Sequence, residues 1–99
     1  MDKIYKYPIP IQHHFSIDLP IGCKILAVQV QREIPCIWVL VNENPPHPRE
    51  FQLVGTGHPI EDSAGLHYIG TFQMDGGTFV FHLFEEMKAP VFEEMKKSE

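Results

Sequence analysis

A chain of 99 residues, of which 43% are hydrophobic and 21% charged, has the length and composition of one globular domain. Eight basic residues against thirteen acidic ones give a net charge of −5, which argues against a nucleic-acid-binding surface. The sequence has no run of about 18 apolar residues, so we expect no membrane span.

Nine prolines and seven glycines interrupt the chain at short intervals, which favours short strands over long helices. We therefore predict an all-β fold: a compact antiparallel β-sandwich or partly open barrel of about seven strands. The predicted strands are Lys3–Tyr7, His14–Leu19, Lys24–Gln31, Ile34–Val41, Glu50–Thr56, His67–Met74 and Thr78–Glu85.

Pro8 and Pro10 follow the first predicted strand and have no N–H to donate to a neighbour, so we expect this strand at the edge of a sheet. The second and third strands alternate between apolar and polar residues, which is typical of strands with one buried face. In the third strand, the alternation predicts Leu26, Val28 and Val30 on one face and Ala27, Gln29 and Gln31 on the other.

Arg32 and Glu33 predict a tight connection to the fourth strand, which is apolar on both faces. One face carries Cys36, Trp38 and Leu40, and the other carries Ile37, Val39 and Val41. Such a strand needs cover on both sides, and a chain this short has little material for a third layer. We therefore expect a homo-oligomer, in which a second chain supplies the cover.

Prolines at positions 45, 46 and 48 predict a loop over Asn42–Arg49. In the sixth strand, the alternation predicts one face made of Tyr68, Gly70, Phe72 and Met74. Asp75-Gly76-Gly77 predicts a hairpin turn, because glycine adopts positive φ without strain. In the seventh strand, Phe79, Phe81 and Leu83 are expected on one face and Val80, His82 and Phe84 on the other.

The composition changes after residue 85, so we divide the chain into a β domain, 1–85, and a polar tail, 86–99. Phe-Glu-Glu-Met-Lys occurs at residues 84–88 and again at residues 92–96. Pro90 separates the two copies, and we expect the tail to be irregular or a short helix, because short isolated helices are only marginally stable. An amphipathic helix that docks on a partner is an alternative for the tail.

Cys23 and Cys36 are the only cysteines, and both lie in apolar surroundings. The sequence has no Cys-x-x-Cys pair, and its first residues are polar, unlike a secretory signal. We expect two free thiols, at least one of them in the core, in a cytoplasmic protein.

Six histidines invite a metal hypothesis, but no pair has the spacing of a ligand motif, so we expect no metal or other cofactor. His58, His67 and His82 are the three that the fold would have to bring together. No serine lies in a nucleophile motif, and the neighbouring carboxylates Glu85 and Glu86 are expected on a solvated face. We therefore predict a protein that is not an enzyme.

The most distinctive local motif is Gly55-Thr56-Gly57-His58. Glycines let backbone amides approach a ligand closely, and the threonine and histidine add hydrogen-bonding groups. We predict that these four residues bind a small anionic ligand, with Arg49 or Arg32 adding positive charge. The alternative is a strand end in which the glycines serve backbone geometry alone.

Four runs together carry a resemblance to a known family: residues 24–31, 34–41, 55–60 and 68–73. They read Lys-Ile-Leu-Ala-Val-Gln-Val-Gln, Ile-Pro-Cys-Ile-Trp-Val-Leu-Val, Gly-Thr-Gly-His-Pro-Ile and Tyr-Ile-Gly-Thr-Phe-Gln. The chain up to about Phe84 resembles a family of small uncharacterised bacteriophage and prophage proteins. The resemblance implies an accessory protein that acts in the bacterial host cytoplasm and sequesters a host factor or a small phosphorylated signal, thereby counteracting host defence. A structural or assembly protein that forms a homo-oligomer is the alternative function.

Overall fold

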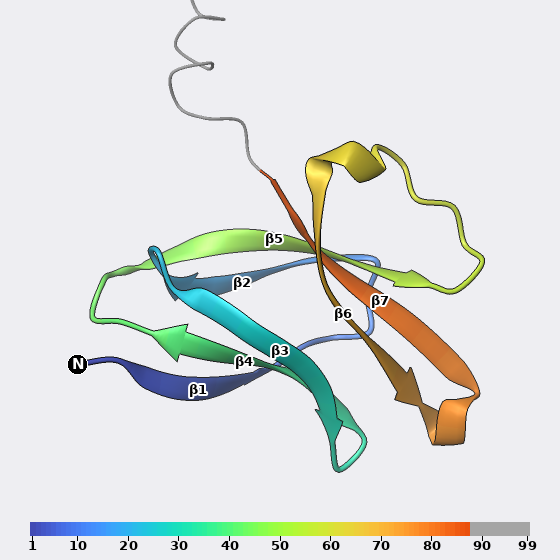
Figure 1. Cartoon of the computed structure of the whole chain (residues 1–99), viewed down its shortest axis with the longest axis horizontal. Coiled ribbons are helices and arrows are strands. Elements are labelled where there is room, and N and C mark those ends of the chain that lie inside the picture. Colours follow the sequence, from blue (N-terminus) through green and yellow to red (C-terminus); the bar gives the residue numbers. More distant parts are fainter. Residues whose placement is uncertain (88–99) are drawn as a thin grey trace, which may run out of the picture.

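The computed structural model describes residues 1–87, which form seven antiparallel strands in two sheets (Figure 1). The strands are β1 (Lys3–Pro8), β2 (His14–Pro20), β3 (Lys24–Gln31), β4 (Ile34–Val41), β5 (Pro46–Gly55), β6 (Leu66–Met74) and β7 (Phe79–Glu86). Short 3₁₀ turns lie at Ser63–Gly65 and Asp75–Gly77. The all-β prediction is confirmed. The predicted conformation of the tail concerns residues from 88 onward, which lie outside the described part of the chain.

The smaller sheet has the strand order β1-β4-β3 and the larger sheet the order β2-β5-β7-β6. β1 is an edge strand, as its prolines predict, and Pro8 is its last paired residue. The chain then passes from the first sheet to the second, and the N–H of Ile9 still donates to the carbonyl of Pro35 on β4 (2.9 Å). The described residues contain no helix with the length and apolarity needed to cross a bilayer.

The core lies between the two sheets and is built from the inward faces of strands of both sheets. Its fully enclosed side chains are Leu19, Ile37, Val39, Phe51 and Leu83, each with no exposed surface. On β4, Ile37, Val39 and Val41 face this core, while Trp38 and Leu40 lie half-buried on the outer face of the smaller sheet. The strand that is apolar on both faces is therefore the centre of the three-stranded sheet.

Where the two sheets meet, β3 and β6 approach each other without pairing. A Cβ atom at Gly70 would come within 2.6 Å of Cγ1 of Val28, which is closer than two carbon atoms can pack. Glycine at position 70 is therefore a packing requirement, since any side chain there would push the two strands apart.

Two β-bulges correct the predicted faces of β3 and β6, because an extra residue reverses the alternation. In β3 the register shifts between Ile25 and Ala27, so Ile25 packs against the core and Leu26 is 44% exposed. In β6 the register shifts between Tyr68 and Gly70, which turns Ile69 inward and leaves Tyr68 53% exposed. The predicted faces were therefore wrong at one residue in each strand: Leu26 does not share a face with Val28 and Val30, and Tyr68 does not share one with Phe72 and Met74.

The loop predicted over residues 42–49 was also wrong beyond Pro45, because β5 already begins at Pro46. Pro46 pairs with Pro20 and Pro48 with Asp18. The N–H of Leu53 donates to the carbonyl of His13. Because backbone groups alternate in direction along a strand, the N–H groups of the odd-numbered residues of β5 face β2. Both strand prolines are even-numbered, so their nitrogens lie on the side of β5 that faces β7. Within residues 1–87, β5 pairs with β7 only from Phe51 onward, so the missing N–H groups break no ladder bond in this part of the chain.

The predicted turns are confirmed. Arg32 and Glu33 both have positive φ, 52° and 66°, as a two-residue turn between β3 and β4 requires. Asp75, Gly76 and Gly77 also have positive φ and connect β6 to β7.

Candidate functional site

The Gly55–His58 motif forms a tight turn at the end of β5. The N–H of His58 donates to the carbonyl of Gly55 (3.1 Å), and Gly57 has φ of 86°, which is typical of the third residue of a type II turn. The imidazole of His58 folds back over Gly55, where a Cβ atom would lie 3.3 Å from the ring. Gly57 therefore meets a backbone requirement of the turn, and Gly55 leaves room for the imidazole of His58.

Thr56 lies in this turn, but its side chain takes part in a different set of contacts. Its hydroxyl lies 2.7 Å from Nε2 of His82, and Nδ1 of the same ring lies 2.9 Å from the hydroxyl of Thr71. The Thr71 hydroxyl also meets the phenol of Tyr68 at 2.5 Å. This chain of polar groups crosses β5, β7 and β6 and fixes the turn to the outer face of the larger sheet.

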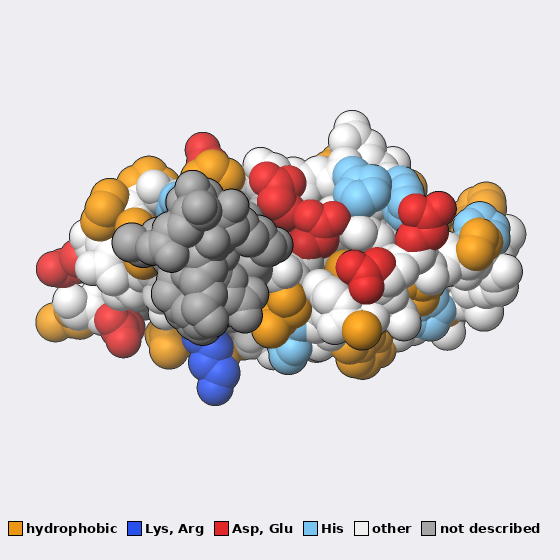
Figure 2. Space-filling model, turned by 90° about the horizontal axis from the view of Figure 1, so that it is seen from above, with side chains coloured by type: hydrophobic (Ala, Val, Ile, Leu, Met, Phe, Trp, Pro, Cys, Tyr) orange, Lys and Arg blue, Asp and Glu red, His pale blue; other side chains and the backbone are white. Residues whose placement is uncertain are grey.

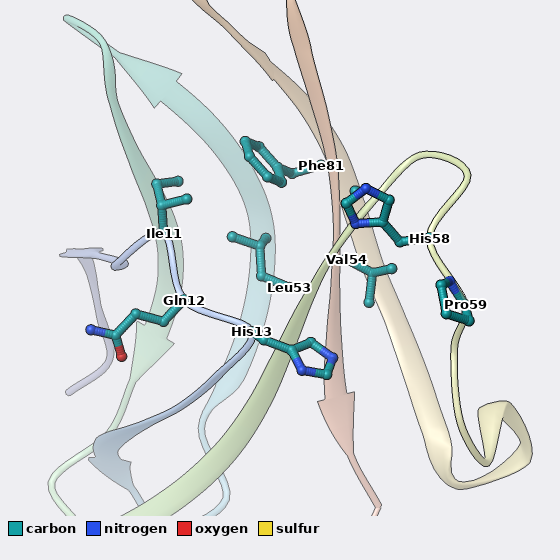
Figure 3. A pocket seen from close by; sticks show the side chains of 9 residues that line it. Ile11, Gln12, His13, Leu53, Val54, His58, Pro59 and Phe81 are labelled. Carbon is teal, nitrogen blue, oxygen red and sulfur yellow. The ribbon is translucent and has the colours of Figure 1, made fainter.

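A pocket of about 330 Å³ lies beside the turn (Figure 3). It is lined by Ile11, Gln12, His13, Leu53, Val54, Gly55, His58, Pro59 and Phe81. Figure 3 shows Ile11, Leu53 and Phe81 on one side of β5 and Val54, His58 and Pro59 on the other. The lining contains no Asp, Glu, Lys or Arg, so its only titratable groups are the imidazoles of His13 and His58.

Of the predicted ligand-binding residues, the structure brings only Gly55 and His58 to this pocket. Thr56 and Gly57 belong to the same turn but do not line it, and neither does Arg49 or Arg32. Arg32 lies in the β3–β4 turn and lines a separate pocket with Lys6 and Gln31.

Arg49 is engaged within the protein. Its Nε donates to Oε2 of Glu85 (2.5 Å), its Nη2 to Oε1 of the same carboxylate (2.7 Å), and its Nη1 to the carbonyl of Cys23 (2.9 Å). The hydrogen bond to Glu85 raises the pKa of Arg49, against the opposing effect of burial. Nearby, burial raises the pKa of Tyr7, with smaller contributions from Cys23 and Tyr5.

Sequence reasoning missed this cluster because Arg49 and Glu85 are 36 positions apart. Glu85 and Glu86 do not form the solvated face that was expected. Both are half-buried, and Glu86 accepts a hydrogen bond from Gln52 (2.9 Å) and lies 3.4 Å from His14. The pairing of β5 with β7 is the signal that would have found the cluster, since it places Glu85 beside Phe51, two residues from Arg49.

The three histidines that the fold would have had to bring together, His58, His67 and His82, do not converge. His58 lines the pocket, His82 is held between two threonine hydroxyls, and His67 lies near the β3–β6 contact. Within residues 1–87, no three side chains of His, Cys, Asp or Glu lie close enough together to hold a metal ion. Figure 2 shows acidic and histidine side chains spread over one face, with Lys or Arg visible at one place only, in keeping with the net charge of −5.

The chain belongs to the family described as a domain of unknown function, DUF7352, whose sequence profile matches residues 1–92. The second Phe-Glu-Glu-Met-Lys copy, which begins at Phe92, lies almost entirely beyond the matched part. No curated protein and no solved structure matches the chain.

Proposed function

We propose that this protein is a non-catalytic binding protein of bacteriophage origin that captures a host factor in the bacterial cytoplasm and thereby counteracts host defence. The observation that supports a binding role is the pocket at the end of β5, which combines an apolar floor with a few polar groups, as ligand sites usually do. The phage setting rests on the resemblance described above.

Of the two ligand classes that the sequence left open, the lining favours a protein over a small phosphorylated signal. Phosphate is usually held by arginine or lysine, and neither residue lines the pocket. Arg49 already donates to Glu85 and Cys23, so using it for a ligand would first require breaking that pairing.

The arrangement of polar groups also supports a role without catalysis. Thr56 and His82 lie at the distance of a nucleophile and its base, but the second ring nitrogen of His82 meets the hydroxyl of Thr71. A hydroxyl does not stabilise a protonated imidazole as a carboxylate does. These side chains serve as cross-strand pairs on a sheet surface.

The test is a pull-down from bacterial lysate with wild-type protein and the variant His58→Ala, followed by mass spectrometry of bound proteins and extracted nucleotides. We expect a protein that is recovered with the wild type and lost with His58→Ala, while His67→Ala, an exposed histidine outside the pocket, retains it. Equal recovery with all three would contradict a binding role for this pocket.

A homo-oligomeric structural protein is the second candidate, and the outer face of the smaller sheet favours it. Ile4, 58% exposed, lies opposite Leu40, and Lys6 lies opposite Trp38. Ile4, Trp38 and Leu40 thus form an apolar stripe that Lys6 and Lys24 flank, and a second copy of the chain would cover it.

A further inference from the structure

The binding pocket contains an unpaired segment of strand edge. β2 and β5 pair as far as the bond from the Leu53 N–H to the His13 carbonyl (2.9 Å). The next rung of the ladder would join Gly55 to Ile11, but the chain turns toward the other sheet before that point. Leu53, Val54 and Gly55 therefore line the pocket as consecutive residues.

Two backbone groups on this edge have no backbone partner within residues 1–87. The alternation of an antiparallel ladder directs the carbonyl of Leu53 and the N–H of Gly55 toward the β2 side. The carbonyl of Gly55 is used in the turn, where it accepts from the N–H of His58. In a parallel pair of strands, one residue donates its N–H to one residue of the neighbouring strand and accepts from the residue two positions further on. The carbonyl of Leu53 and the N–H of Gly55 therefore match the N–H and C=O of a single residue in a strand that runs parallel to β5.

We propose that the occupant of this pocket is an extended peptide segment of a partner protein, which adds to the larger sheet beside β5; this inference rests on the binding role proposed above. The docked residue lies opposite Val54, donates its N–H to Leu53 and accepts from Gly55. This is recognition by strand addition, in which main-chain bonds hold the peptide and alternate side chains select it.

The residues that line the pocket determine which side chains that peptide can carry. The docked residue points to the Val54 side, near the imidazole of His58, and so has a hydrogen-bonding side chain. Its two neighbours point to the opposite side, where Ile11, Leu53 and Phe81 are apolar. The peptide pattern is therefore apolar, hydrogen-bonding, apolar.

A second pocket of about 500 Å³ continues the first and shares Ile11 and Phe81 with it. It is lined by Ile11, Glu33, Met74, Asp75, Phe79 and Phe81. Since Gly55 pairs with Phe81 and β7 runs antiparallel to β5, this pocket lies ahead of a peptide that runs parallel to β5. Its two carboxylates complement a lysine or arginine that follows the apolar residues of the peptide.

The test starts with selection of random nine-residue displayed peptides on the purified full chain. We expect enrichment of the pattern apolar, hydrogen-bonding, apolar, with lysine or arginine following it. The best peptide is then synthesised with and without an N-methyl group on its central residue. N-methylation removes the donor to the Leu53 carbonyl, and we expect about a ten-fold loss of affinity by calorimetry. The amide of Gly55 should exchange more slowly with solvent in the complex.

The double variant Glu33→Gln, Asp75→Asn should weaken the same peptide several-fold, while Glu61→Gln, an exposed acid outside both pockets, should not. The proposal is overturned if no peptide is enriched over a control protein, or if N-methylation and Gly55 exchange are both without effect. A partner that depends on His58 in the pull-down, together with a failed selection, would leave the binding role standing and remove strand addition.

Discussion

Arg49 on β5 and Glu85 on β7 form a two-bond ion pair on the inward side of the larger sheet, with side chains 23% and 17% exposed. The same guanidinium reaches Cys23, the residue just before β3, so one side chain links the larger sheet to the segment that enters the smaller sheet. This pair closes the end of the sandwich opposite to the pocket, because Arg49 lies six positions before Gly55 on a single strand.

The variant Arg49→Met should lower the free energy of unfolding by about 1–3 kcal/mol, because it leaves the half-buried carboxylate of Glu85 without its partner. Urea denaturation measures the change. Arg32→Met is the matched control, since Arg32 is exposed in a turn, and its effect should stay within about 0.5 kcal/mol. Equal effects of both substitutions would show that the pair adds nothing.

Gly70→Ala should destabilise the protein by about 1–3 kcal/mol, because its Cβ would overlap the side chain of Val28. The double variant Gly70→Ala, Val28→Ala should lose less stability than the two single variants added together, since removing the valine methyl groups makes room. Strict additivity in urea denaturation would contradict a direct clash.

The sequence predicted the strands and turns well, because alternation and turn residues are local signals. β3 and β4 have the predicted bounds, Lys24–Gln31 and Ile34–Val41. It failed where one residue changes the geometry. The residue types around Leu26 and Tyr68 do not indicate the two bulges. Pro46 can begin β5 because, within residues 1–87, β7 pairs with β5 only from Phe51 onward.

The candidate site was predictable only in part, for the same reason. Gly55 and His58 form a recognisable turn, and both line the pocket. His13 and Phe81 come from distant parts of the chain, and only the pairing of β2, β5 and β7 brings them there. Arg49 suggested anion binding by its charge, but its partners depend on the same pairing.

Thr56→Val should lower stability by less than about 1 kcal/mol, because it removes an exposed hydrogen bond to His82 and a long one to the carbonyl of Val80 (3.5 Å). It should leave partner capture unchanged, because Thr56 does not line the pocket, whereas His58→Ala abolishes capture. The pull-down described above measures both. If the Thr56→Val protein folds stably but no longer captures the partner, the threonine hydroxyl takes part in binding.

The protein should be a homodimer or higher oligomer at micromolar concentration, measured by light scattering. Ile4→Glu should convert it to a monomer, because it places a charge in the apolar stripe beside Leu40. Ile60→Glu is the control, because Ile60 is an exposed isoleucine in the β5–β6 connection, away from the smaller sheet. A monomeric wild type would rule out the stripe as a self-association surface at that concentration.

Both cysteines should resist alkylation in the folded protein and react fully once it is unfolded without reductant. Cys23 and Cys36 are buried and unpaired, with exposures of 7% and 2%. Cys36 lies on the outer face of the smaller sheet, opposite Pro8, so its burial depends on neighbouring side chains on that face. Intact mass after iodoacetamide should show no added group in native buffer and two in denaturant, because access controls thiol reactivity.

Lys6 donates to Gln31 across this face (2.6 Å), and both residues line the same pocket as Cys36. Lys6→Ala should therefore speed native labelling, with tandem mass spectrometry placing the label on Cys36. Rapid labelling of the wild type in native buffer would show that the outer face is open at Cys36, and two unlabelled cysteines in denaturant would show a disulfide.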